Sequence, residues 1–331
     1  SCYSLELRDL SRAEHTYHDP FPSRIEFHQE SFGNNRLTRR SRADAFTWAT
    51  PARIGWEASH LSYYSSDAEG ITGLSSPKRY LWDSREQIHE WQFNNFGRRE
   101  KSAHEPAIKG SFFRFLTNDG DEWQKDNADS VCATRARYSR SSMMMFYLAE
   151  VFAQALTQIN SFGLRKKRPY TDVPRRLNCI ILTMPTAMTI PERRLFDKWA
   201  QLALKIVADA FKLEQESQPQ FVLQWDEATG TQTVFLYNEI KANYRGDIDL
   251  FYTANSRASG ATKSRTSENT SSSANTSTSE VAGEKTIRIA SLDIGGGTTD
   301  LIINNYNVLD GSAVRPEHEL REGFNIAGDD I

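Results

Sequence analysis

The sequence of 331 residues predicts a protein of the α/β class, in which helices cover β-sheets. Two observations carry this prediction. Residues 179–240 alternate between strand-like and helix-like patterns, and residues 287–304 contain two apolar strands around a glycine-rich turn. Strands that alternate with helices along a chain are typical of layered α/β architectures.

Composition and charge exclude several classes of protein. Lys and Arg total 40 and Asp and Glu total 43, so the net charge is −3, which argues against a dedicated nucleic-acid binder. No window approaches the ~18 apolar residues that a membrane-spanning helix needs. Cys2, Cys132 and Cys179 lie far apart, which excludes a disulfide framework and a CxxC zinc site and suits a reducing compartment. We therefore expect a soluble, globular protein with no membrane span.

The first elements follow a polar segment. Residues 1–47 are rich in Arg and lack periodicity, so we expect a solvated surface. Residues 51–58 predict a short buried strand that turns into a helix. Residues 72–82 predict a loop that enters a helix, with Ser76 as its N-cap and Pro77 in its first turn.

A long helix is predicted after Ser141 and Ser142, either of which can cap it. Its apolar residues recur at a spacing of three and four, which places them on one helical face. These residues are Met144, Leu148, Val151, Phe152, Ala155 and Ile159.

Two further strand–helix pairs follow. Residues 179–184 form a continuous apolar run, which is typical of a strand covered on both faces. Thr189 and Glu192 form a capping box that opens a second amphipathic helix. Residues 221–225 predict another strand, followed by a helix through Ile240.

A compositional break separates this region from the last one. Of the 25 residues from Ser256 to Glu280, 14 are Ser or Thr and none is a large apolar residue. Such a segment buries too little apolar surface to offset the entropy of ordering it, which predicts a flexible insertion. The predicted organisation is a polar segment, a first lobe, a disordered linker and the start of a second lobe, at residues 1–47, 48–253, 254–286 and 287–331. Because the chain ends inside a patterned segment, we expect it to be a piece of a longer protein.

The glycine-rich turn carries the chemistry. Strands at 287–294 and 300–304 flank Gly295, Gly296 and Gly297, so the linkage is a tight hairpin. Successive glycines leave backbone N–H groups free of side chains, and such groups form a concavity that suits phosphate oxygens. A P-loop or a dinucleotide-binding turn would need a strand that runs into a helix, which this context excludes.

Oxygen ligands flank the same turn. Asp293 and Asp300 supply carboxylates and Thr298 supplies a hydroxyl. A Mg²⁺–phosphate complex requires donors for the anion and hard oxygens for the cation or its waters. The sequence therefore predicts a phosphate site, with Asp293 and Asp300 at the metal.

The string from Leu292 to Leu301 resembles the second phosphate motif of the actin-like ATPases, the superfamily of actin, sugar kinases and DnaK-type chaperones. The resemblance implies an actin-like ATPase (ribonuclease H-like) fold with two lobes, here incomplete. Weaker matches occur in the expected order. Residues 73–81 resemble the chaperone segment that offers a lysine, here Lys78, to the γ-phosphate, and residues 225–229 resemble the segment that places a glutamate, here Glu227, near the metal.

Residues 323–330 are similar to the turn that follows the second phosphate hairpin in this superfamily, which implies that Gly328 contacts the nucleotide. Ala327 stands where the superfamily has a glycine. The resemblance also implies a first phosphate hairpin before residue 1 and an adenosine motif after residue 331.

Longer strings resemble the bacterial virulence factor SrfB family. These strings are residues 70–83, 225–229 and 236–240. The resemblance implies a large, virulence-associated, cytoplasmic protein of Gram-negative bacteria, whose export would depend on a signal outside this sequence.

The expected function is Mg²⁺-dependent binding, and hydrolysis, of ATP. In this hypothesis Lys78 and Glu227 are catalytic, Asp293 and Asp300 bind the metal, and the remaining site residues bind the nucleotide. Those residues are Gly295, Gly296, Gly297, Thr298, Thr299 and Gly328.

Two alternatives stay open. One is a catalytically inactive scaffold or filament protein that acts through self-association or an unidentified protein partner. The other is nucleic-acid binding through Arg165–Arg168 with Arg175 and Arg176, which the acidic balance of the chain disfavours.

Overall fold

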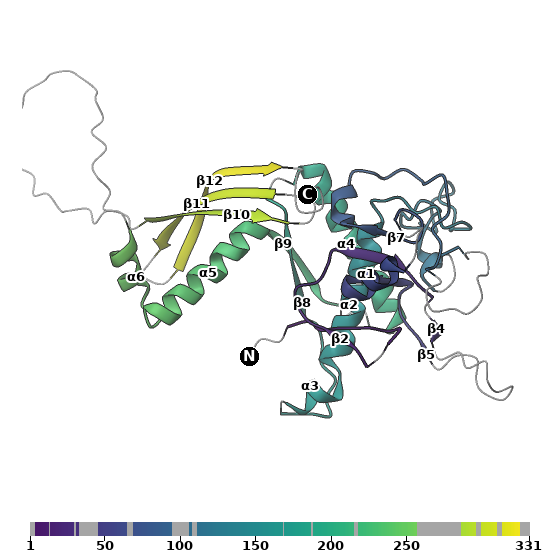
Figure 1. Ribbon diagram of the computed structural model, residues 1–331, viewed down its shortest axis with the longest axis horizontal. Helices are drawn as coiled ribbons and strands as arrows, with labels where there is room; N and C mark the ends of the chain where they lie inside the picture. The colour runs from purple at the N-terminus through teal and green to yellow at the C-terminus, as the bar shows by residue number, and fades with distance from the viewer. Residues whose placement is uncertain are drawn as a thin grey trace, which may run out of the picture. The chain divides into compact units, whose positions relative to one another are not determined.

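The computed structural model describes most of the chain, in two compact units (Figure 1). Unit 1 comprises Ser1–Leu182 and Thr189–Leu223, and unit 2 comprises Thr183–Met188 and Gln224–Ile331. The described residues are 4–12, 14–29, 31–32, 46–64, 69–94, 106–107, 111–167, 169–186, 188–214, 218–256, 286–295, 299–309 and 313–324.

A three-stranded antiparallel sheet lies in the core of unit 1. Its central strand is β3 (Arg24–Phe27), which pairs with β6 (Ala52–Ile54) and with β7 (Gly73–Ser75). Ile25 and Phe27 on β3 are fully buried. The expectation of a solvated surface for residues 1–47 is therefore wrong for β3, because this short strand is stabilised by partners that lie far away in the sequence.

The strand-to-helix turn at residues 51–58 is confirmed, since β6 runs directly into α1 (Gly55–Tyr63). The helix expected after Ser76 is a short 3₁₀ helix, η1 (Pro77–Tyr80). Ser76 does precede it, but its backbone lies in the left-handed region, with φ of 48°, and its side chain makes no capping hydrogen bond. A side-chain cap needs extended backbone at the capping residue, which explains the difference.

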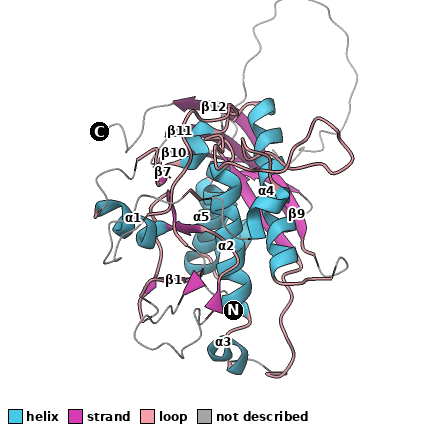
Figure 2. Cartoon of the chain, turned by 90° about the vertical axis from the view of Figure 1, so that its right-hand side faces the viewer, coloured by secondary structure: helices cyan, strands magenta, loops and turns pink. Residues whose placement is uncertain are grey.

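Helices α2 (Met143–Ile159) and α4 (Ile190–Ala210) pack side by side in unit 1 (Figure 2). The predicted capping box is confirmed: the Thr189 side chain accepts from Glu192 N, and Thr189 N donates to Glu192 Oε2 at 2.9 Å. Ser142 precedes α2 but makes no side-chain cap, because its hydroxyl donates to Ser139 O at 2.7 Å.

Smaller elements complete unit 1. They are α3 (Phe162–Lys166), η2 (Ser111–Phe115), and two-stranded sheets of β1 (Leu7–Arg8) with β2 (Thr16–Tyr17) and of β4 (Ser31–Phe32) with β5 (Phe46–Thr47). Strands β8 (Cys179–Met184) and β9 (Gln220–Asp226) pair with each other, and each runs from one unit into the other. The predicted strand at residues 179–184 is confirmed, but the prediction that both its faces are covered is wrong, since Ile181 is 62% exposed.

Unit 2 is a sheet with helices on one face. Antiparallel strands β10 (Thr286–Ile294), β11 (Thr299–Leu309) and β12 (Ala313–Phe324) lie in that order, and α5 (Glu227–Asn243) packs on β10 and β11. Helix α6 (Ile248–Asn255) packs on β10. The core contains Leu236, Phe251, Tyr252 and Tyr306.

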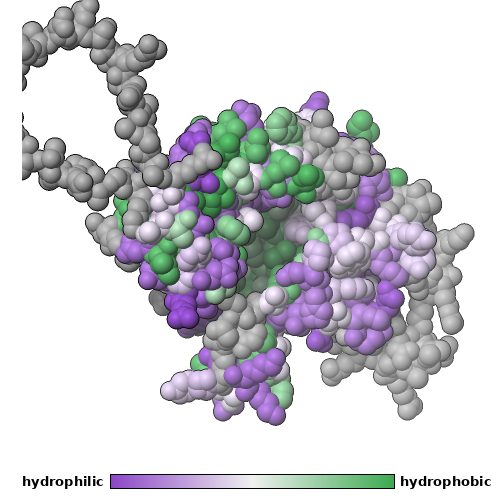
Figure 3. Space-filling model, turned by 60° about the vertical axis from the view of Figure 1, so that its left-hand side comes forward, coloured by the Kyte–Doolittle hydropathy of each residue, from purple (hydrophilic) through white to green (hydrophobic). Residues whose placement is uncertain are grey.

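The other face of this sheet exposes apolar side chains. Leu292 and Ile294 on β10, with Leu320 and Phe324 on β12, are exposed and pair with β11 residues that alternate with the buried ones. Figure 3 shows patches of hydrophobic surface, in green, on the face of the molecule that it presents. We call these four residues the outer apolar face.

The division into units differs from the predicted one. Helices α5 and α6 belong with the sheet of unit 2, so the boundary falls near Gln224 instead of residue 253. The fold is of the mixed α/β kind that the alternating patterns predict. The Ser/Thr-rich segment from 257 to 285 lies outside the described residues.

Candidate functional site

The predicted hairpin is confirmed and places its two aspartates opposite each other. Asp293 near the end of β10 is the direct register partner of Asp300 at the start of β11. Opposed residues of an antiparallel pair project from the same face of the sheet. Asp293 is exposed, whereas Asp300 is only 2% exposed. The hairpin therefore presents one buried and one accessible carboxylate side by side.

The turn itself is described in part. Gly295 is exposed directly after β10, and Thr299 is half-buried as the first residue of β11. Gly296, Gly297, Thr298 and Gly328 lie outside the described residues.

The N-terminus of α5 is the second part of the candidate site. Glu227 is the first residue of the helix, and Asp226 caps it by accepting from Thr229 N at 2.7 Å and Thr229 Oγ1 at 2.8 Å. Arg321 of β12 donates to Asp226 Oδ2 at 3.4 Å. Arg321 is the register partner of Ile302, which lies two residues from Asp300 on β11. The start of α5 is thus held next to the hairpin end of the sheet.

A buried polar network fixes α5 on the sheet. Asn304 Nδ2 donates to Thr229 Oγ1 at 3.1 Å and to Gln232 Oε1 at 2.8 Å. Tyr306 donates to the same Gln232 oxygen at 2.9 Å, and Gln232 Nε2 donates to Ser291 Oγ at 2.8 Å. Asn304, Gln232 and Tyr306 are almost fully buried. Paired polar groups in a low-dielectric interior have few alternative geometries, so this network sets the register of the helix against the strands.

His318 extends the network to β12. Partial burial first, and then the neighbouring Arg321, lower the pKa of His318, which favours the neutral imidazole. Its Nδ1 lies 2.7 Å from Asn304 Oδ1, and its Nε2 lies against the Arg321 guanidinium. A neutral ring that donates through Nδ1 and accepts through Nε2 satisfies both contacts.

The site fits a cation only together with an anionic ligand. Within the described ranges, no three side chains of His, Cys, Asp or Glu lie close enough together to hold a metal ion. Mg²⁺ is usually held by one or two carboxylates, with waters and phosphate oxygens as its other ligands. Asp293 and Asp300 match that donor set when a phosphate completes it.

The predicted catalytic residues fall in different units. Glu227 shares unit 2 with the hairpin, whereas Lys78 is the second residue of η1 in unit 1 and is half-buried. The sequence prediction missed Asp226, His318 and Arg321. A signal existed for Asp226, since aspartate is a preferred residue at the position directly before a helix. No local pattern marks the other two, because β12 brings them to α5 only in the folded chain.

The fold and the site define a class: a mixed α/β protein with a carboxylate-flanked glycine hairpin. The family model described as Virulence factor SrfB matches residues 1–331, so the chain belongs to the SrfB virulence factor family. A comparison with curated proteins finds no match. None of the helices in the described ranges combines the length and hydropathy that spanning a bilayer requires.

Proposed function

We propose that this SrfB-family chain is part of a Mg²⁺-dependent ATP-binding and ATP-hydrolysing protein with the actin-like ATPase fold. The observation that carries the proposal is the register pairing of Asp293 and Asp300 at the glycine-rich turn between β10 and β11. This pairing puts two hard oxygen ligands beside a backbone segment whose composition suits phosphate.

The N-terminus of α5 adds to this support. The helix dipole places partial positive charge at Glu227, and the Asp226 cap and the network to Asn304 hold that end against the sheet. Since the Asp226 and Glu227 carboxylates occupy this positive end, its contribution is to fix Glu227 near the paired carboxylates. Phosphoryl transfer depends mainly on such positioning and charge stabilisation.

Each predicted site residue has a role in the proposal. Asp293 and Asp300 hold Mg²⁺ or its waters, and residues 295–299 with Gly328 hold the phosphates. Lys78 neutralises charge on the γ-phosphoryl group, and Glu227 orients the attacking water. The metal supplies charge stabilisation to the transferring group.

Phosphate release tests the hydrolytic part of the proposal. We expect the full-length protein to release phosphate from Mg-ATP, and Glu227→Gln to reduce the rate roughly 100-fold or more because positioned proton-transfer groups contribute that much. Glu239→Gln is the matched control, since it lies on the same helix and should retain the wild-type rate. Equal rates for the two variants would contradict the role of Glu227.

A second candidate function is a nucleotide-binding scaffold without turnover. It is favoured by the outer apolar face, because an exposed cluster of large apolar side chains is typical of a surface that meets another protein. Wild-type protein that binds ATP but releases no phosphate above background would select the scaffold over the ATPase.

A further inference from the structure

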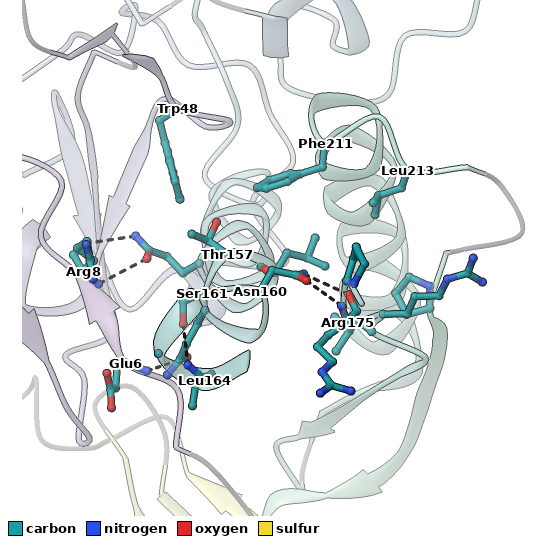
Figure 4. Close-up of a pocket in the computed structure, with 18 of the residues that line it drawn as sticks. Glu6, Arg8, Trp48, Thr157, Asn160, Ser161, Leu164, Arg175, Phe211 and Leu213 are labelled. Atoms are coloured by element: carbon teal, nitrogen blue, oxygen red, sulfur yellow. Dashed lines mark hydrogen bonds between the residues drawn. The ribbon is translucent and has the colours of Figure 1, made fainter. Parts of the chain in front are cut away.

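A large cavity lies within unit 1, beside the C-terminal half of α2 (Figure 4). Its volume is about 1250 Å³. The lining comes from β1, from α2, from residues 174–177 before β8 and from residues 211–214 after α4. We call it the α2 pocket. It contains none of the residues assigned to the nucleotide site.

Side-chain amides of Gln154 in α2 and of Asn160, the residue that follows α2, hold two segments that form its walls. Gln154 accepts from Arg8 N at 3.4 Å and donates to Arg8 O at 3.3 Å. Asn160 accepts from Arg175 N at 2.8 Å and donates to Arg175 O at 3.1 Å. Each amide therefore satisfies both backbone groups of one residue, as the dashed lines in Figure 4 show. Walls anchored in this way are already formed before any ligand arrives, which is typical of binding pockets.

The charge of the lining is strongly unbalanced. Two carboxylates, Glu6 and Glu214, face an excess of cations, and within the described ranges none of these cations forms an ion pair with a carboxylate. The cations are Arg8, Lys167, Arg175, Arg176 and Lys212. Since the whole chain carries a net charge of −3, this excess of positive charge is local and does not reflect the composition of the chain. Uncompensated cations in a concave site attract an anion.

Apolar groups line the same cavity. The rings of Trp48 and Phe211 extend toward the space above α2 in Figure 4. Leucine side chains complete the apolar part: Leu10, Leu156, Leu164, Leu177 and Leu213. A purely inorganic anion would leave this surface in contact with water, so the lining suits a ligand with an apolar body.

The geometry points to the α2 pocket as a binding site for an amphipathic anion, with a phosphate or carboxylate head and an apolar body. Lys167, Arg175 and Arg176 receive the head, and Trp48 and Phe211 cover the body. The volume exceeds the roughly 300–1,000 Å³ of common small-molecule pockets, which leaves room for a body of eight or more carbons. This site is independent of the proposed nucleotide site.

Titration calorimetry with three probes tests the site: octyl phosphate, octanol and inorganic phosphate. We expect octyl phosphate to bind at least roughly tenfold more tightly than either the neutral alcohol or the head group alone, because only it engages both parts of the lining. Arg176→Glu should weaken octyl phosphate roughly tenfold, since it replaces an exposed attracting charge with a repelling one. Lys125→Glu makes the same charge change at an exposed residue outside the pocket and should leave affinity unchanged.

Several results would overturn the inference. They are equal binding of octanol and octyl phosphate, no binding of octyl phosphate up to about 1 mM, or equal effects of the two charge reversals. Thermal unfolding of each variant reports whether it folds. If Arg176→Glu does not fold, Lys167→Glu at the exposed end of α3 replaces it with the same expected loss.

Discussion

Two buried carboxylates in unit 1 share a single guanidinium. Arg53 Nε lies 3.8 Å from Glu57 Oε1, and Arg53 Nη1 lies 4.0 Å from Glu150 Oε2. Each carboxylate also anchors backbone or side chains from other segments: Glu57 accepts from Leu10 N at 3.1 Å, and Glu150 accepts from Trp48 Nε1 at 2.7 Å. Burial is the main cause that raises the pKa of both carboxyl groups, and Arg53 opposes it. The two carboxyl groups thus anchor neighbouring segments, and their burial favours the protonated form that Arg53 opposes.

Glu57 gives the stability of unit 1 a defined pH dependence. Its pKa is raised to about 7, so between the unfolded value of about 4.5 and pH 7 the folded state holds a proton that the unfolded state has lost. Stability from this group is therefore greatest at the acidic end and falls as the pH rises through this window. Glu57→Gln mimics the protonated form, so its stability should not change with the ionisation of this group. Between pH 4.5 and pH 7 the wild-type free energy of unfolding should therefore fall by up to about 3 kcal/mol more than that of the variant, at 1.36 kcal/mol for each pKa unit. Urea unfolding at a series of pH values measures it.

The control for this prediction is Glu14→Gln, because Glu14 is an exposed carboxylate of the same unit. It should leave the pH profile unchanged. A Glu57→Gln profile parallel to the wild-type profile would show that Glu57 ionises as it does in the unfolded chain.

At the scale of elements, α5 is attached to its sheet as much by polar contacts as by apolar ones. Leu236 packs in the core near Tyr306, while one turn earlier Gln232 is bonded to both β10 and β11. This second contact lies toward the N-terminus of α5, the end that the proposed site uses. Rigid placement of Glu227 therefore depends on Gln232.

We expect Gln232→Leu to reduce the free energy of unfolding by about 2 kcal/mol or more. The leucine fills a similar volume but leaves the Tyr306 hydroxyl, one Asn304 donor and the Ser291 hydroxyl without their partner, and buried polar groups left unpaired cost about 1–3 kcal/mol each. Thr231→Val on the exposed side of α5 should change stability by less than about 0.5 kcal/mol. If urea denaturation shows equal losses of unfolding free energy for Gln232→Leu and Thr231→Val, the polar network does not hold α5 on the sheet.

The elements that the sequence predicted well are those whose signals are local. The capping box at Thr189 and the hairpin around Gly295 depend on residues within a few positions of each other, and both are confirmed. Strand β3 was missed because its burial depends on β6 and β7, which follow much later in the chain. The exposure of Ile181 was not predicted, because a continuous apolar run does not distinguish a strand that is covered on both faces from one that is covered on a single face.

The same distinction between local signals and contacts of distant segments applies to the candidate nucleotide site and to the α2 pocket. The glycines and aspartates of the hairpin are contiguous in sequence and could be identified directly. Arg321 and His318 could not be found, since only the pairing of β12 with β11 brings them to the start of α5. The residues that line the α2 pocket likewise come from segments between Glu6 and Pro219, so no local sequence pattern predicts the pocket.

At the scale of the whole molecule, the residues with proposed roles belong to two different units. The hairpin, Glu227 and their supporting network belong to unit 2, whereas Lys78 and the α2 pocket belong to unit 1. The proposed nucleotide site depends first on one part of unit 2, the hairpin between β10 and β11.

The affinity of the full-length protein for Mg-ATP, measured by titration calorimetry, tests that part most directly. The measurement compares wild type with Asp293→Ala and with Glu317→Gln, an exposed carboxylate of the same sheet. We expect wild type and Glu317→Gln to bind alike, and Asp293→Ala to bind roughly tenfold or more weakly, a loss of about 1.4 kcal/mol. If Mg-ATP does not bind near 1 mM, or if Asp293→Ala leaves the affinity intact, the hairpin is not the metal and phosphate site.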